Sequence, residues 1–344
     1  MDQFLSVGKL PHDLLSHLLA RAPIHDTRLL LGPGVGLDCA IIDYGETALV
    51  LKSDPITFTT HEIGWYAVQV NANDIATTGA TPRWLLVTVL LPGKETTEDL
   101  VERISNQIFN ACEEIGVALI GGHTEITHGL DRPILMATLI GEVARKNLIT
   151  PRGAIPGDRL LLTKGVPIEA TAILAREFSE RLLSNLNHST LSITELEQAQ
   201  GFLYRPGISV LHEARLAVQA GQVHAMHDPT EGGIYTALWE LAEACGHSLS
   251  IDLSTIPVPE LSQRICQIFG LDPLGAMASG ALLLAVPASE TSRIIRNIQA
   301  SHINCVEIGQ VIDILGSPTV YSEASGNKKP IPRPDRDEIA KLFE

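Results

Sequence analysis

The sequence lacks several features that define large protein classes. No apolar run approaches the ~18 residues of a membrane-spanning helix, so no transmembrane segment is expected. No Cys-x-x-Cys pair occurs, and the five cysteines are scattered and odd in number, which argues against a disulfide framework and favours buried thiols in a reducing, cytoplasmic compartment. The first residues also lack the basic and apolar segments of a signal peptide.

Basic residues are few compared with acidic ones, and this limits the partners to be expected. The chain has 25 Lys and Arg against 40 Asp and Glu, with a formal net charge of -15 and a pI of about 5.2. Nucleic acid and anionic membranes both require a basic face, so neither is expected as the main partner. A nucleotide remains compatible with this charge, because a metal ion and backbone amides can bind its phosphates.

Two common nucleotide-binding loops are also absent. The Gly-Val-Gly at residues 34–36 is not followed by the Gly-Lys-Ser or Gly-Lys-Thr of a P-loop. It precedes an expected hairpin and does not open a helix, which excludes a dinucleotide-binding fingerprint. A nucleotide site in this chain therefore needs a different construction.

The length and composition predict two α/β domains. The chain has 344 residues and is 45% hydrophobic, which is enough for two cores of ordinary size. Helical and strand patterns alternate in both halves, as is typical of α/β layers. Residues 151–158 are rich in proline and glycine, so we expect an N-terminal domain over residues 1–152, a C-terminal α/β domain over 153–325 and an extended polar tail over 326–344.

Two aspartates flank a predicted β-hairpin near the start of the first domain. Folding residues 38–54 about a turn at 45–46 brings Asp38 and Asp54 nearly opposite each other, where Cβ atoms are roughly 5 Å apart. Two carboxylates that close repel unless a positive charge lies between them, and Mg²⁺ is a suitable cation because it prefers carboxylate oxygen. The alternative is a slightly different register in which both acids are solvated strand ends.

A helix predicted over residues 63–79 supplies a further acid. Asn71 and Asp74 are three residues apart and share a face, and the helix has no Lys or Glu. A buried carboxylate needs a partner or a metal, so Asp74 is a candidate third ligand beside Asp38 and Asp54. A solvated polar stripe is the alternative.

A second candidate site follows a strand predicted over residues 117–120. Gly121 and Gly122 allow a ligand to approach the backbone closely, and ligand sites in α/β folds gather where strands end. His123, Thr124 and Glu125 then supply a possible base, a hydroxyl and an acid.

The second half contains two more strand-to-helix turns with polar residues. At one of them, Lys164 and Gly165 suit a phosphate bound at a helix start, although an ordinary turn explains the pattern equally well. The other turn holds an acid pair, a hydroxyl and a glycine pair: Asp228, Thr230, Glu231, Gly232 and Gly233. Thr230 can cap the following helix, but the two glycines weaken a first turn and indicate close approach of a ligand or another chain.

Taken in order, these motifs resemble one superfamily over nearly the whole chain. It includes aminoimidazole ribonucleotide synthase, thiamine-monophosphate kinase, selenophosphate synthetase and the hydrogenase-maturation protein HypE. The likeness rests on the glycine-rich loop with Asp38, the hairpin to Asp54, Asn73-Asp74, Gly121-Gly122-x-Thr124, Thr163-Lys164-Gly165, and Asp228-x-Thr230-x-Gly232-Gly233.

The resemblance implies a two-domain PurM-like fold that forms a homodimer through its N-terminal sheets. It also implies an enzyme that uses ATP and Mg²⁺ to phosphorylate an oxygen of a small-molecule or carbamoyl-type substrate. Carried over by position, the metal ligands are Asp38, Asp54 and Asp74, and the catalytic candidates are His123, Glu125, Asp228 and Glu231. The expected cofactor-binding residues are Gly36, Asn71, Asn73, Gly121, Gly122, Thr124, Lys164, Gly165, Thr230, Gly232 and Gly233.

The sequence departs from this pattern at two places. HypE proteins end in a tail with a reactive cysteine, whereas the last cysteine here is Cys305, so chemistry on a tail thiol is not expected. Thiamine-monophosphate kinases carry Asp at the position of His123. A histidine cannot be a carboxylate ligand for Mg²⁺, and Glu125 is a possible substitute for that ligand. An alternative function is therefore that of an ATP-binding scaffold that acts mainly through a maturation-protein partner.

Overall fold

The computed structural model describes residue 5 and residues 10–34, 36–56, 59–184, 191–313, 317–324 and 327–342. The chain forms two compact units. The N-terminal unit comprises Asp26–Gly32 and Asp38–Leu148, and the C-terminal unit comprises Met1–His25, Pro33–Leu37 and Ile149–Glu344. The break after Leu148 lies close to the boundary expected at residue 152, but the first 25 residues belong to the C-terminal unit.

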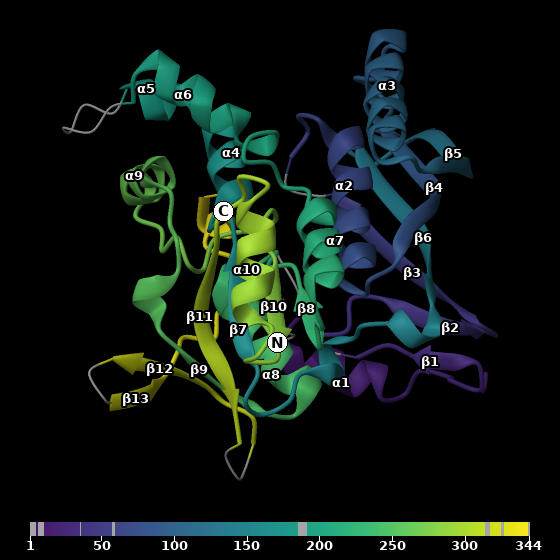
Figure 1. The fold of residues 1–344 in the computed structure, drawn as a ribbon. Helices are drawn as coiled ribbons and strands as arrows, with labels where there is room; N and C mark the ends of the chain where they lie inside the picture. The colour runs from purple at the N-terminus through teal and green to yellow at the C-terminus, as the bar shows by residue number, and fades with distance from the viewer. Residues whose placement is uncertain are drawn as a thin grey trace, which may run out of the picture. The chain divides into compact units, whose positions relative to one another are not determined.

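The N-terminal unit is a six-stranded sheet with two helices. In spatial order its strands are β1 (Leu29–Leu31), β2 (Ala40–Tyr44), β3 (Thr47–Ile56), β6 (Ile134–Ala144), β4 (Thr81–Pro92) and β5 (Ala118–Thr127). All neighbours are antiparallel except β4 and β5. Helices α2 (Ile63–Thr77) and α3 (Glu98–Ile115) lie side by side in this unit (Figure 1).

The local sequence explains both helices. The hydroxyl of Thr97 accepts the amide of Leu100 at the start of α3, and Gly116 ends the helix in the left-handed region. Only one stripe of α3 is buried, whereas α2 is buried over nearly its whole length. Gly64 of α2 faces the backbone of Ile104 in α3 so closely that a Cβ would have to displace it, which lets the two helices pack tightly.

The C-terminal unit is a seven-stranded sheet covered by helices. Its strands, in spatial order, are β13 (Asn327–Pro330), β12 (Val320–Ala324), β9 (Ser248–Ile251), β11 (Cys305–Ile312), β7 (Arg159–Thr163), β10 (Leu283–Val286) and β8 (Ala225–His227). Its longer helices are α1 (His12–Leu19), α4 (Ile168–Glu177), α6 (Ile193–Gln200), α7 (Leu211–Ala220), α8 (Gly233–Cys245), α9 (Glu260–Phe269) and α10 (Thr291–Gln299), with α5 (Ser179–Ser184) between α4 and α6. The α/β composition of both halves confirms the predicted fold class, although most strand pairs are antiparallel.

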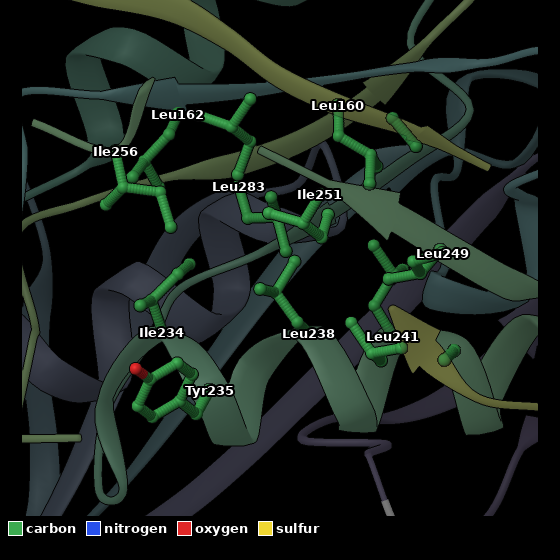
Figure 2. Close-up of a cluster of buried hydrophobic side chains, with 14 of the residues drawn as sticks. Leu160, Leu162, Ile234, Tyr235, Leu238, Leu241, Leu249, Ile251, Ile256 and Leu283 are labelled. Atoms are coloured by element: carbon green, nitrogen blue, oxygen red, sulfur yellow. The ribbon is translucent and has the colours of Figure 1, made fainter. Parts of the chain in front are cut away.

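The main core of this unit lies between α8 and one face of the sheet. Figure 2 shows Ile234, Leu238 and Leu241 of α8 facing Leu160 and Leu283 of the strands. Leu161 is also fully buried and, by strand alternation, points to the opposite face, so both faces of the sheet are covered.

Part of the segment expected as an extended tail is built into this unit. Strand β13 pairs with β12, and Ile339–Leu342 form a short 3-10 helix. Among the described residues, no helix is long and apolar enough to cross a membrane.

Candidate functional site

The three predicted metal ligands of the N-terminal unit meet around a lysine that the sequence analysis did not single out. The ammonium of Lys52 lies 3.0 Å from the carboxylate of Asp54, 3.2 Å from that of Asp74 and 3.9 Å from that of Asp38. These residues come from β3, from α2 and from the segment before β2. The predicted convergence of the three acids is therefore present, with a protein cation among them.

The hairpin has the predicted turn at residues 45–46, with Tyr44 opposite Thr47. Ala40 pairs with Leu51, and the ladder ends there, so its continuation sets Ser53 opposite Asp38. Asp54 is thus one residue from the position directly opposite Asp38, in agreement with the expectation that the two acids lie nearly opposite each other. Lys52 and Asp54 are two residues apart on one strand and share a face, which brings the ammonium to the carboxylates.

Asn71 ties α2 to β3 beside this cluster. Its side-chain oxygen accepts the amide of Asp54, and its side-chain nitrogen donates to the carbonyl of Ala67. Asn73 is fully buried on the same helix. The role of both asparagines in cofactor binding remains a prediction, and the contacts of Asn71 show a supporting role for the cluster.

Burial and neighbouring charges set the protonation of this cluster. Burial raises the pKa of Asp74 to about 7, with Lys52 opposing the rise and the other two acids adding to it. Burial by itself would lower the pKa of Lys52, but the three carboxylates outweigh it and hold that pKa well above its usual value. Lys52 is therefore a permanent positive charge in the cluster.

The carboxylates of this cluster are chemically suited to a divalent cation, and Lys52 lies among them in the structure. Carboxylate oxygens are the protein ligands that Mg²⁺ prefers, and one or two of them normally hold it beside phosphate oxygens. Asp38 and Asp54 are partly exposed, so a phosphate can reach this side of the cluster. We name these residues, with Asp74 and Lys52, the acidic cluster.

The Gly121-Gly122 pair lies inside a strand and does not follow one. Strand β5 continues through both glycines to Thr127 and is exposed along almost its whole length, so the predicted short buried strand is wrong. A Cβ at Gly122 would overlap the carbonyl oxygen of Val87 on the neighbouring strand β4. The close approach that requires glycine here is thus made by β4, at an irregularity in the β4–β5 register.

The three polar residues after the glycines remain on this exposed strand. His123 and Glu125 form an exposed pair, with 3.4 Å between the ring nitrogen and the carboxylate. Thr124 is exposed between them. Their catalytic and cofactor-binding roles remain predictions.

Lys164 is engaged in the interior of the C-terminal unit. Its ammonium lies 2.6 Å from the carboxylate of Glu213 and donates to the carbonyls of Gly207 and Ser209. The amide of Gly165 also donates to a backbone carbonyl. These contacts favour the ordinary turn between β7 and α4, and the proposed phosphate contact of Lys164 and Gly165 would require them to open.

The Gly232-Gly233 pair is held by two distant parts of the same unit. Gly232 donates its amide to the carboxylate of Asp337, and a Cβ at Gly233 would overlap the carbonyl oxygen of Leu274. Both glycines have positive φ, and Gly232 precedes the first residue of α8. The prediction that Thr230 caps this helix is therefore wrong, because the two left-handed residues delay its start.

Three buried acids surround this turn. Burial raises the pKa of Glu169 to about 7 and that of Asp337 to about 6, and the charge of Glu231 raises both further. Asp228 is also buried, directly after His227, whose ring nitrogen lies 3.0 Å from the carboxylate of Glu240.

A cavity of about 470 Å³ opens beside the same turn. Glu231, Gly232 and Asp337 line it, together with Trp239, Glu240 and Arg333. Gly36 does not line it, but its backbone approaches the carbonyl oxygen of Glu240 so closely that only glycine fits. Two of the predicted site residues, Glu231 and Gly232, therefore line the same cavity of the C-terminal unit.

Two models of known protein families match this chain. Residues 36–143 match the N-terminal domain of AIR synthase related proteins, and residues 156–315 match the C-terminal domain. The chain belongs to the AIR synthase related protein family. This confirms the superfamily inferred from the order of motifs and its two-domain PurM-like fold.

Two relatives within this family have names linked to hydrogenase maturation. A protein of Methanocaldococcus jannaschii, provisionally named a hydrogenase expression/formation protein, is 30% identical over 83% of this chain and 82% of its own length. The carbamoyl dehydratase HypE of Cupriavidus necator is 28% identical over 75% of this chain and 70% of its own length.

Solved structures share the family fold. HypE in complex with HypF superimposes with a TM-score of 0.71 at 20% identity, covering 87% of this chain and 94% of the other. HypE in complex with ATP gives 0.67 at 23% identity, covering 92% and 88%. A ThiL protein bound to AMPPCP and TMP gives 0.68 at 21% identity, covering 92% and 93%.

Sequence reasoning missed Lys52, Glu169 and Asp337. A lysine in an otherwise apolar strand, two residues before a predicted metal ligand, is a local signal that could have identified Lys52. Glu169 occupies the first turn of a helix, which is an ordinary place for an acid. Asp337 lies more than a hundred residues from Gly232, and no local pattern connects the two.

Proposed function

We propose that this protein is an enzyme that uses Mg²⁺ and ATP to phosphorylate an oxygen of a small-molecule substrate. The acidic cluster is the observation that carries the proposal, because three carboxylates from separate elements converge at one place in the N-terminal unit. Relatives of the same family include a carbamoyl dehydratase and a thiamine-monophosphate kinase, and a HypE structure contains ATP.

The residues of the cluster have distinct parts in this proposal. Asp38, Asp54 and Asp74 would hold Mg²⁺, which supplies positive charge to phosphate oxygens when it is bound. Asn71 positions Asp54 through the amide of that residue. We assign the second substrate to the part of the C-terminal unit that carries Asp228 and Glu231. His123 and Glu125, on the exposed strand β5, are the candidates for a base and an acid.

The test compares two aspartates of the same hairpin. Asp54→Asn should abolish Mg²⁺-dependent ATP hydrolysis with a substrate pool and remove the extra thermal shift that Mg²⁺ adds to an ATP analogue. Asp43→Asn is the matched control, because the Asp43 carboxylate pairs with Arg145 outside the cluster. Unchanged hydrolysis and an unchanged Mg²⁺ effect in Asp54→Asn would contradict the proposal.

We also propose that the enzyme is a cytoplasmic homodimer. Trp84, Leu86 and Met136 lie on one face of the N-terminal sheet, and Leu86 and Met136 are 38% and 49% exposed. Exposed apolar surface of this kind supports a protein contact, and a second copy of the sheet offers a matching face. The described cysteines are all free thiols, which supports a reducing compartment.

A second candidate is an ATP-binding maturation protein that acts through a protein partner. It is favoured by the names of the relatives and by the HypE structure in complex with HypF. A thermal-shift screen with an ATP analogue present separates the two. A small molecule that adds to the shift supports the enzyme, whereas a shift caused only by a partner protein supports the scaffold.

A further inference from the structure

The acidic cluster contains its own cation. Lys52 has only 10% of its side chain exposed, and its ammonium lies within 4 Å of all three carboxylates. Asp74 is almost fully buried, with only 4% of its side chain exposed. An ammonium held this way adds positive charge beside the same carboxylates that would bind a cation, so the two influence each other.

We infer that Lys52 is a built-in counter-ion that weakens cation binding at the acidic cluster and limits it to one divalent ion per subunit. This inference rests on the proposed function, because it concerns the same Mg²⁺ site. It adds a residue that determines how many cations that site accepts and how tightly it holds them.

Charge balance supports this role. A bound cation favours the ionised form of all three carboxylates, which together with one ammonium have a net charge of two minus that a single divalent cation neutralises. Without the ammonium, the carboxylates would repel one another at short range and attract cations more strongly. A second divalent ion would then have a binding place that Lys52 now occupies.

A purely structural role for Lys52 makes a different prediction. If the lysine only joins β3 to α2, its removal should lower stability and leave cation binding at the remaining carboxylates unchanged. Cation affinity and stoichiometry therefore distinguish the two roles, whereas stability alone does not.

The experiment measures Mn²⁺ binding by electron paramagnetic resonance and equilibrium dialysis, with and without a non-hydrolysable ATP analogue. Wild-type protein should bind one Mn²⁺ per subunit with the analogue. Lys52→Gln should bind Mn²⁺ at least tenfold more tightly without nucleotide and should take up a second ion with it. Lys146→Gln, at an exposed position of the same unit, should behave as wild type.

The outcomes separate this inference from the proposed function. Wild-type affinity and one ion per subunit in Lys52→Gln would overturn the counter-ion role alone. Absence of any Mn²⁺ from wild-type protein with the analogue would overturn both proposals.

A second pair of variants serves if Lys52→Gln does not fold. Asp38→Asn removes one negative charge from the partly exposed side of the cluster, and Lys52→Gln/Asp38→Asn restores the original balance. The double variant should bind Mn²⁺ at least tenfold more tightly than Asp38→Asn. Equal affinities in these two variants would overturn the inference.

Discussion

The ammonium of Lys164 lies 2.6 Å from the carboxylate of Glu213, and both side chains are buried in the C-terminal unit. The same ammonium donates to the carbonyls of Gly207 and Ser209, so its three hydrogens have acceptors. Lys164 adopts a left-handed backbone conformation directly after β7. The pair therefore joins β7, the segment before α7 and α7 itself.

Breaking this ion pair should destabilise the protein strongly. Lys164→Met leaves the Glu213 carboxylate buried without its cation, so we expect a loss of about 3–5 kcal/mol in the free energy of unfolding. Lys164→Met/Glu213→Leu removes both charges and should lose much less. Urea unfolding measures both values, and equal losses in the two variants would contradict the structural role.

The same double variant tests the phosphate contact suggested by the sequence. If Lys164 is structural, Lys164→Met/Glu213→Leu should keep the thermal shift produced by an ATP analogue. Loss of that shift in a folded double variant would support the phosphate-binding role of Lys164 instead.

Glu169 should make stability fall as the pH rises. Burial raises its pKa to about 7 from 4.5, so the folded protein binds more protons than the unfolded chain between these values. Its contribution is fully present below about pH 4.5 and is lost as the pH rises through 7, a change of about 3 kcal/mol at most. Asp337, with a pKa raised to about 6, acts in the same direction.

Glu169→Gln isolates this effect because the amide cannot ionise. The variant should have a higher melting temperature than wild type at pH 8 and a flatter dependence between pH 5 and pH 8 by thermal unfolding. The exposed Glu180→Gln should leave the pH profile unchanged. A wild-type slope in Glu169→Gln would show that this carboxyl does not titrate as expected.

The two ends of α8 provide a matched test of close packing. Gly233 and Gly246 both have positive φ, but only Gly233 lies against other backbone, that of Leu274 and Ala276. Gly246→Ala should cost about 1–2 kcal/mol from the left-handed conformation alone. Gly233→Ala should cost at least 2 kcal/mol more, because the backbone must move. Equal costs in urea unfolding would refute the packing explanation.

The exposed face of the N-terminal sheet should mediate dimerisation. Leu86 and Thr88 point to the same side of β4, and Thr88 pairs with Met136 of β6. If the proposed dimer uses this face, Leu86→Asp/Met136→Asp should convert it to monomers in sedimentation experiments. Phe109→Asp changes an exposed apolar residue of α3 and should leave the dimer intact. A persistent dimer in the first variant would exclude this face.

Local signals predicted the helices well. The residue pattern predicts a helix over residues 63–79, and α2 spans Ile63–Thr77. Thr97 caps α3 at its start and Gly116 ends it, and this helix spans Glu98–Ile115. These elements agree because caps, glycines and hydrophobic periodicity act within a few residues of the chain.

The glycine motifs were located correctly, but the sequence did not identify which atoms of the chain approach them. Gly122 and Gly233 both require close approach of other atoms, as the sequence indicated. The approaching atoms are those of Val87 and Leu274, which lie on other elements of the chain. Nothing in a local pattern distinguishes backbone from ligand as the neighbour of a glycine.

The sequence by itself determined the α/β class, the approximate limits of α2, the family and the set of acids that converge. Only the tertiary structure decided that Lys52 lies among those acids, that Lys164 points to Glu213 and that Asp337 accepts the amide of Gly232. The physical reason is distance along the chain. Local propensity acts within a few residues, whereas a buried charge takes its partner from whichever distant segment the packing brings beside it.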